Sequence, residues 1–215
     1  MDARQRSLQE LQQIKTMMER SSKFISLSGL SGIAAGLTAL IAAWIAYPKV
    51  KCLMSGDCSS LSNANPAKLE NDLLYLAIIT FAVAFFSAFL FTWYRSKKTG
   101  VPLWGNTAYR LFWNTAIPLF AGGLFLLRSM DLGHYELVAP GCLIFYGLAL
   151  INASKYTLGE IRYLGYAELI LGIINLWMIG YGLYFWAAGF GILHIIYGIV
   201  MWYKYERVTR TENNE

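Results

Sequence analysis

Charged residues are scarce in this chain, because only 14% of its 215 residues are Asp, Glu, Lys or Arg while 56% are hydrophobic. A soluble domain carries about 25% charged residues, so this shortage excludes an ordinary soluble domain. The apolar surplus needs a lipid solvent, and we expect the bilayer to be the main partner. The net charge of +5 is not gathered into a basic tract with interleaved aromatics, which disfavours nucleic acid as a partner.

Residues that bind metals or carry out catalysis are also few. The three cysteines are too few and too irregularly spaced for a zinc knuckle or a disulfide scaffold. Only one of the two histidines lies in an apolar segment, which disfavours a haem held by paired axial histidines. The sequence lacks His-Glu-x-x-His, a Walker loop and Gly-x-Ser-x-Gly. We therefore predict no enzymatic activity, no metal and no cofactor.

Long apolar runs are what the sequence has in abundance. A helix rises about 1.5 Å per residue, so roughly 20 apolar residues cross a bilayer core about 30 Å thick. Six segments meet or approach that length, which predicts an all-α bundle of six transmembrane helices in the unit 24–203. The expected spans are 24–47, 73–94, 111–127, 137–151, 164–179 and 183–203.

The third and fourth of these segments are weaker than the others. The third contains Asn114 and Pro118, and the fourth is short with Pro140 near its start. A re-entrant hairpin is the alternative for this pair, but it would place the charged residues between the two segments deep in the membrane, where charges are costly. Two full spans put those charges in water, and we favour six spans.

Basic residues indicate the orientation, since cytoplasmic loops are enriched in Lys and Arg. With six spans, one side holds 14 of the 18 Lys and Arg and the other holds four. This predicts both termini in the cytoplasm. The four on the outer side are Lys49, Lys51, Lys68 and Arg128.

Two segments outside the spans carry structural hypotheses. Residues 1–23 have apolar side chains at helical spacing, which predicts an amphipathic helix on the cytoplasmic membrane surface that could instead dimerise or dock a soluble partner; residues 204–215 form a cytoplasmic tail. The external loop 48–72 holds Cys52 and Cys58, which could pair in an oxidising compartment. Asp131, His134 and Glu136 in the second external loop resemble no strong metal motif, and solvated residues paired with Arg128 are the simpler interpretation.

The last two spans contain the main candidate site. Glu168 lies thirteen residues before Tyr181, in the tight turn 180–182, and His194 lies thirteen residues after it. Equal distance from the turn predicts equal depth, so we expect Glu168 to contact His194, with Asn175 as a further polar group. Ionisable groups inside a membrane are expensive and are candidates for proton handling. The alternative is a hydrogen-bonded pair that only sets the register of the hairpin.

Small residues predict how these spans pack. They recur at alternating intervals of three and four, which suits close helix contact. We expect the stripe on the fifth span to pack against the one on the sixth, and the stripe on the first span to lie inside the bundle or at a dimer interface. The three stripes are Gly165, Glu168, Gly172, Asn175, Ile179; Ala187, Gly191, His194, Gly198, Met201; and Ser28, Gly32, Ala35, Ala39, Ala42.

Three strings are distinctive in this chain: 20–29 (RSSKFISLSG), 144–156 (IFYGLALINASKY) and 189–194 (GFGILH). They resemble a family of small bacterial six-helix integral membrane proteins, and the resemblance covers nearly the whole chain. It implies a bacterial cytoplasmic (inner) membrane protein, and the family carries no assigned activity.

Two functions remain open from the sequence. The first is a non-enzymatic scaffold, regulator or assembly partner that binds a cytoplasmic protein or forms a homodimer. The second is a small proton-linked carrier or channel that uses Glu168 and His194.

Overall fold

The computed structural model describes residues 29–56, 58–59, 61, 65–99 and 105–204, and this part of the chain is helical. The predicted helix at 1–23 and all of the tail but Lys204 lie outside these residues. The elements are α2 (Gly29–Ser55), α3 (Pro66–Thr99), α4 (Asn106–Asp131), the short 3₁₀ helix η1 (Tyr135–Leu137), α5 (Val138–Ala153), α6 (Ile161–Trp177), α7 (Gly182–Trp186), the π-helix η2 (Ala187–Leu193) and α8 (His194–Trp202).

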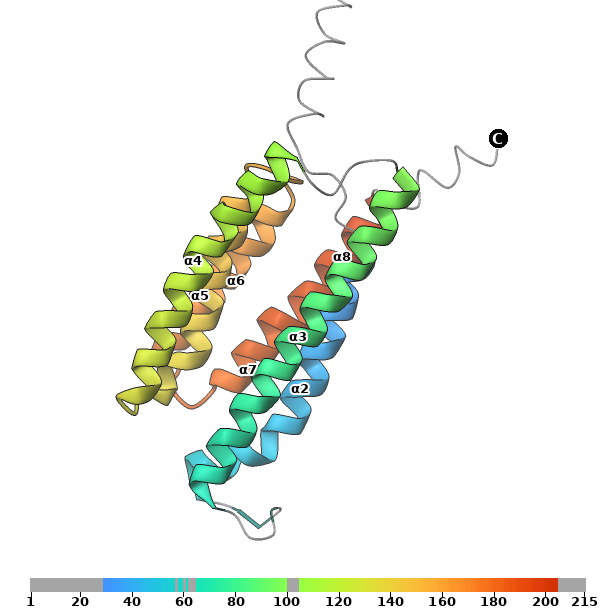
Figure 1. The fold of residues 1–215 in the computed structure, drawn as a ribbon. Coiled ribbons are helices and arrows are strands. Elements are labelled where there is room, and N and C mark those ends of the chain that lie inside the picture. The colour runs from blue at the N-terminus through green and yellow to red at the C-terminus, as the bar shows by residue number, and fades with distance from the viewer. Residues whose placement is uncertain (1–28, 57, 60, 62–64, 100–104, 205–215) are drawn as a thin grey trace, which may run out of the picture.

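The helices run up and down between the same two ends of the molecule (Figure 1). Since α7, η2 and α8 follow one another without a break, the described chain makes six rods. Contacts between the segments that connect the helices show which helix ends lie at the same end of the molecule. The Tyr135 hydroxyl donates to Glu70 Oε2 at 3.2 Å, which puts η1 beside the start of α3. At the opposite end, Lys204 after α8 forms an ion pair with Glu160 before α6.

The rods form two groups of three. In one group, α2 packs between α3 and the rod α7–η2–α8; we call this the α2 half. In the other, α5 packs between α4 and α6, and we call this the α5 half. The two groups stand side by side in Figure 1. The two halves meet where α5 and α6 contact α7 and η2. A side chain at that junction can therefore contact both halves.

Five described helices are long and apolar enough to cross a membrane. They include α4 and the η1–α5 segment, which correspond to the two weaker predicted spans. The remaining rod, α6, has 17 residues and is shifted relative to the predicted span 164–179. It begins earlier, at Ile161, and ends at Trp177, because Met178 leaves the helical conformation at φ −110° and ψ 62°. The predicted end at residue 179 therefore lies beyond the helix.

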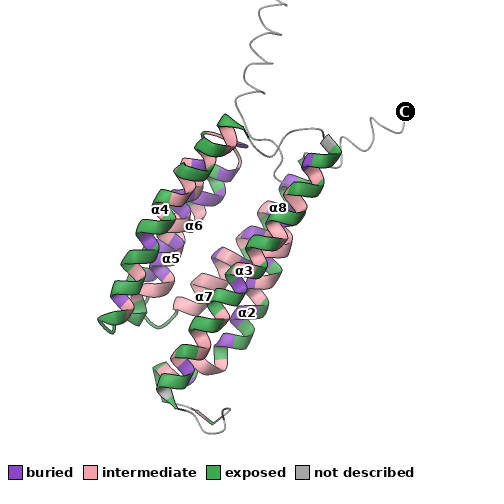
Figure 2. Ribbon diagram, viewed as in Figure 1, coloured by how far each residue is buried: buried purple, intermediate pink, exposed green. Residues whose placement is uncertain are grey.

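Apolar side chains cover the outside of the molecule. Large exposed hydrophobic residues occur on every rod, and only 6% of the apolar stretch is buried in each of α3 and α4. In Figure 2 the buried residues lie mainly where neighbouring helices face each other. A surface of this kind is stable against lipid tails and would aggregate in water.

Glycines bring the helices of each half into backbone contact. A Cβ atom on Gly198 of α8 would lie 2.6 Å from the Gly29 carbonyl oxygen of α2, and one on Gly36 of α2 would lie 2.6 Å from the Gly191 carbonyl oxygen. In the α5 half, a Cβ on Gly147 would lie 2.7 Å from the Gly165 carbonyl oxygen of α6. No side chain larger than hydrogen fits at these crossings.

These contacts correct the predicted partners of the small-residue stripes. Gly165 and Gly172 of α6 pack on α5, and Gly191 and Gly198 pack on α2, so these four glycines do not join the last two rods to each other. The stripe of the first span does lie inside the bundle, where Ala39 and Ala42 are buried. Spacing identifies a smooth helix face, but several helices could cover it, and the sequence does not select among them.

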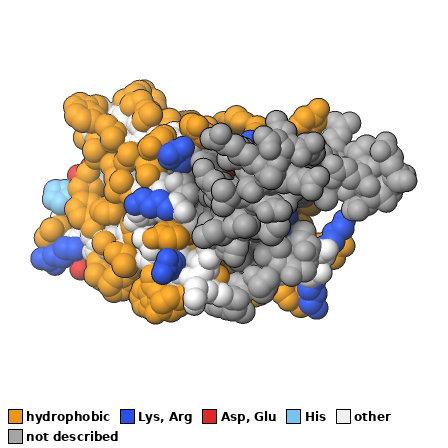
Figure 3. All heavy atoms as spheres, turned by 90° about the horizontal axis from the view of Figure 1, so that it is seen from above, with side chains coloured by type: hydrophobic (Ala, Val, Ile, Leu, Met, Phe, Trp, Pro, Cys, Tyr) orange, Lys and Arg blue, Asp and Glu red, His pale blue; other side chains and the backbone are white. Residues whose placement is uncertain are grey.

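The two ends of the described bundle differ in charge. The end at which α2 begins and α8 finishes has seven basic side chains and one acidic one among the described residues. Figure 3 looks onto this end, with blue Lys and Arg side chains among apolar ones. The opposite end has four of each sign and is balanced. The first set is Arg95, Lys97, Lys98, Arg110, Lys155, Arg162, Lys204 and Glu160; the second is Lys49, Lys51, Lys68, Arg128, Glu70, Asp72, Asp131 and Glu136.

Candidate functional site

Glu168 and His194 come together at the junction between the two halves. Glu168 lies in the middle of α6, and His194 is the first residue of α8, directly after the π-helix. The His194 Nδ1 atom lies 3.4 Å from Glu168 Oε1. The carboxyl therefore belongs to the α5 half and the imidazole to the α2 half, so this contact joins the two.

Tyr146 on α5 is the third polar member of the site. Its hydroxyl lies 2.8 Å from His194 Nε2, within hydrogen-bonding distance. The other ring nitrogen, Nδ1, donates to the Gly189 carbonyl oxygen at 3.0 Å. The imidazole is thus held between α5 and its own helix, with both ring nitrogens bonded.

These bonds restrict the proton positions on His194. A carbonyl oxygen only accepts, so Nδ1 carries a proton. In the neutral imidazole Nε2 then accepts a hydrogen bond from the Tyr146 hydroxyl, whereas in the imidazolium Nε2 donates one to the Tyr146 oxygen. Both forms preserve the hydrogen bond, so His194 can gain or lose a proton without breaking its contacts.

Glu168 has none of this support. Its side chain is 0% exposed, and neither carboxyl oxygen has a hydrogen-bond partner among the described residues. An ionised carboxylate in such a place needs a cation beside it, and His194 is the only basic side chain in the described part of the chain that lies against it. A neutral site therefore holds one proton, either on Glu168 or as the second proton of His194.

Gly189 of the π-helix makes room for this carboxyl group. A Cβ atom at Gly189 would lie 2.4 Å from Glu168 Oε2 and 2.4 Å from Leu143 Cδ2. The π-helix ends one residue before His194, and its Gly189 carbonyl holds His194 Nδ1. Single π turns in α-helices occur frequently at functional sites; here a seven-residue π segment presents both the glycine and the imidazole to Glu168.

Asn175, the third predicted site residue, lies apart from the pair. It is two helical turns further along α6, where its Nδ2 atom donates to the Met178 carbonyl oxygen at 3.3 Å. This bond closes the end of α6 before Gly180, whose φ of +96° turns the chain toward α7. Asn175 Oδ1 is buried and has no hydrogen-bond partner, but the described contacts give Asn175 a role in the turn.

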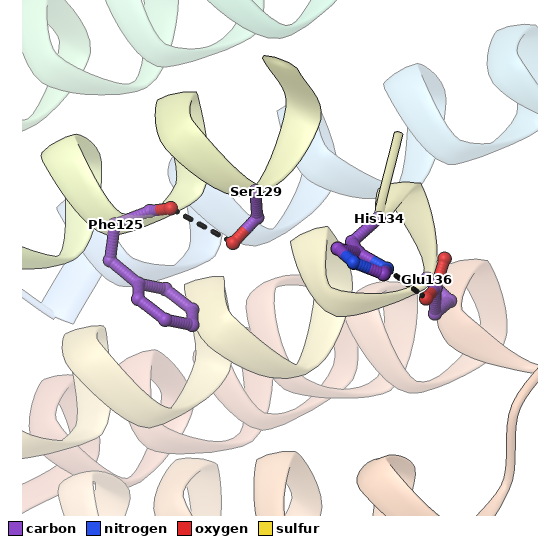
Figure 4. A network of polar contacts seen from close by, with 4 residues as sticks. All are labelled: Phe125, Ser129, His134 and Glu136. Atoms are coloured by element: carbon purple, nitrogen blue, oxygen red, sulfur yellow. Dashed lines mark hydrogen bonds and ion pairs between the residues drawn. The ribbon is translucent and has the colours of Figure 1, made fainter. Parts of the chain in front are cut away.

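The other predicted candidates lie near the balanced end. Cys52 and Cys58 are joined by a disulfide, and Cys142 is a free cysteine on α5. His134 Nδ1 lies 3.1 Å from Glu136 Oε1, as Figure 4 shows. In the same view the Ser129 hydroxyl donates to the Phe125 carbonyl oxygen on α4.

The acidic loop residues do not gather into a metal site. Asp131 pairs with Arg128 at 3.9 Å, while His134 pairs with Glu136. Within the residues that the structure describes, no group of three or more His, Cys, Asp or Glu side chains could hold a metal ion.

Sequence reasoning missed Tyr146 and Gly189. Tyr146 carries a hydroxyl group in an otherwise apolar stretch of α5, and this was the one sequence feature that could have pointed to it. Nothing in the sequence shows that it meets His194, which is 48 residues away. The proximity of Gly189 to Glu168 likewise appears only once α6 and the π-helix are in place.

No protein-family model matches this chain, and no similar protein was found among curated sequences or solved structures. The family resemblance and the function therefore stay predictions, and the site carries the functional argument.

Proposed function

We propose that the protein is a six-span membrane protein of the bacterial cytoplasmic membrane that moves a small solute in exchange with protons bound at Glu168 and His194. One observation carries the proposal: a fully buried carboxyl without a hydrogen bond faces an imidazole on the other half of the molecule. If Glu168 served only packing, an apolar side chain at its position would be less costly to bury. A group that must exchange a proton needs to be ionisable.

The arrangement of the two halves supports a carrier. Within each half, glycines hold helices in backbone contact, while the junction between halves contains the polar site. Transporters commonly move one bundle against another around a site near the membrane midplane. A change in proton count at Glu168 and His194 alters the attraction between the halves at the place where they would separate.

The proposed orientation places the basic end in the cytoplasm, with both termini there, and counts α6 as the fifth of six spans. The difference between seven basic and four basic side chains at the two described ends supports it. The disulfide supports it as well, because Cys52 and Cys58 then lie on the oxidising side.

Thiol labelling tests this orientation. In a Cys142→Ser background, protein taken from cells under acid quench should not react with a maleimide until it is reduced, and should then take up two labels per chain. This result follows because an extracytoplasmic pair is oxidised. Free Cys52 and Cys58 in freshly quenched cells would place the loop in the reducing cytoplasm and contradict the orientation.

Proton exchange at Glu168 tests the function. Proteoliposomes on a solid-supported membrane should give a transient current after a pH step, because protons enter the site and the halves rearrange. Glu168→Gln should lower the amplitude of this current at least tenfold, while circular dichroism shows that the protein is still folded. Glu160→Gln, an acid-to-amide change before the start of the same helix, is the matched control and should retain it. Equal currents from wild type and Glu168→Gln would refute a proton site at Glu168.

The scaffold function is a second candidate, favoured by the strongly basic end that the proposed orientation presents to the cytoplasm. Its expected observation is a protein recovered at equal stoichiometry after gentle purification, retained in Glu168→Gln and lost when residues 1–23 are deleted. A protein that purifies alone and shows the pH-step current supports the carrier over the scaffold.

A further inference from the structure

We infer that the solute exchanged for the proton is a hydrophobic organic cation without strong hydrogen-bond donors, such as a quaternary ammonium or phosphonium ion, bound between Glu168 and a ladder of aromatic rings. This inference rests on the proposed proton site and names its substrate class. The ladder consists of Trp186, Phe190, His194 and Tyr146, and it is defined by ring contacts.

The rings follow one face of the last rod. Trp186, Phe190 and His194 are spaced four residues apart, and their centroids are separated by 5.3 Å and then 5.9 Å. Tyr146 from α5 covers the same face, with its ring 5.0 Å from Phe190 and 5.4 Å from His194. Aromatic faces attract cations, so the ladder offers a continuous path for a cation to the buried acid.

Exposure changes along the ladder in the direction that a ligand would follow. Trp186, Phe190 and Tyr146 are half-buried, His194 is 8% exposed, and Glu168 is fully buried at its end. The half-buried rings lie at the junction of the two halves. A cation that is soluble in the membrane interface can reach these rings before the halves separate, whereas Glu168 becomes available only when they do.

The chemistry around Glu168 selects the kind of cation. Calcium takes about six to eight oxygen ligands and magnesium about six, but the described residues supply one carboxyl group here and no cluster of acids. Neither carboxyl oxygen accepts a hydrogen bond, and its neighbours include Gly189 and Leu143. These surroundings suit a diffuse charge on an apolar body, which loses little hydration on entering.

The exchange balances in charge and protons. Before exchange, Glu168 and His194 share one proton and are neutral together. When a monovalent cation binds, that proton leaves to water, Glu168 is the carboxylate, His194 is the neutral imidazole, and the cation supplies the positive charge. One proton leaves for each cation bound, so no net charge is left in the site.

Binding should depend on pH through this pair. The titratable groups that face Glu168 are His194 on α8 and Tyr146 on α5, and Tyr197 on α8 acts electrostatically on Tyr146. Protons compete with the cation for the site, so the affinity for the cation should fall as the pH is lowered.

Calorimetric titration with tetraphenylphosphonium is the direct test. The full chain in nanodiscs is titrated in two buffers of different ionisation enthalpy, which gives the number of protons released per cation. We expect one site and one proton. Glu168→Gln should weaken binding by at least a hundredfold and abolish the proton release, and Phe190→Leu should weaken it by about tenfold, as expected for loss of a cation–π contact.

Two controls and the pH-step current separate the possible failures. Trp177→Leu removes an aromatic ring that is 79% exposed on α6, and Glu160→Gln removes an acid outside the site; both should bind like wild type. If the pH-step current depends on Glu168 but tetraphenylphosphonium binds equally to wild type and Glu168→Gln, the cation inference is wrong and the proton site stands. If neither measurement depends on Glu168, both proposals fail.

Discussion

Replacing His194 with Leu is expected to lower the free energy of unfolding by about 3 kcal/mol at pH 7. Among the described residues, the substitution removes the only basic side chain beside Glu168. The carboxyl, which has no hydrogen-bond partner among those residues, is then left buried without a cation beside it. Removing one partner of a buried ion pair is strongly destabilising because the other charge is left uncompensated.

Unfolding in mixed micelles at pH 7 measures this loss. His134→Leu is the matched control, since the chain has two histidines and this one is exposed. It should change stability by less than about 0.5 kcal/mol. If His194→Leu loses no more stability than His134→Leu, Glu168 does not depend on His194 for charge neutrality.

Gly198→Ala is expected to destabilise the α2 half by about 1–3 kcal/mol. The added methyl group would lie 2.6 Å from the Gly29 carbonyl oxygen and 2.7 Å from Ile33 N, which are rigid backbone atoms. The helices must therefore separate, and the contacts along α2 and α8 weaken together.

Gly123→Ala on α4 is the matched control, because nothing lies within 4 Å of a Cβ atom at that position. There the substitution should be neutral or stabilise by up to about 1 kcal/mol, since alanine is the better helix former. Opposite signs for the two changes, measured by thermal unfolding in the same micelles, are the expected result. Equal effects would mean that the α2–α8 contact is not as close as the structure has it.

Part of the predicted site could be found from the sequence because of the geometry of a helical hairpin. Two helices joined by a tight turn place residues at equal distances from it at equal depth, and Glu168 and His194 do meet. Asn175, named as a further polar group, lies near the end of α6 at Trp177, and its side chain is engaged in the turn. Regularity holds in the middle of a helix and is lost near its end.

The sequence by itself determined the class of molecule and the places where its helices occur. Long apolar runs require helices that satisfy their own backbone hydrogen bonds in lipid, and the described helices coincide with the predicted segments apart from their ends. These properties depend on local composition, so a linear reading is sufficient.

Only the tertiary structure decided which helix faces which. A glycine stripe can receive several partners, and the choice of α2 for Gly198 and of α5 for Gly165 depends on the packing of all the rods together. That choice divides the molecule into two halves and leaves the α6–α8 contact to Glu168 and His194. It also brings Tyr146 and Gly189 to the pair, because residues far apart in the chain become neighbours only when every helix has found its place.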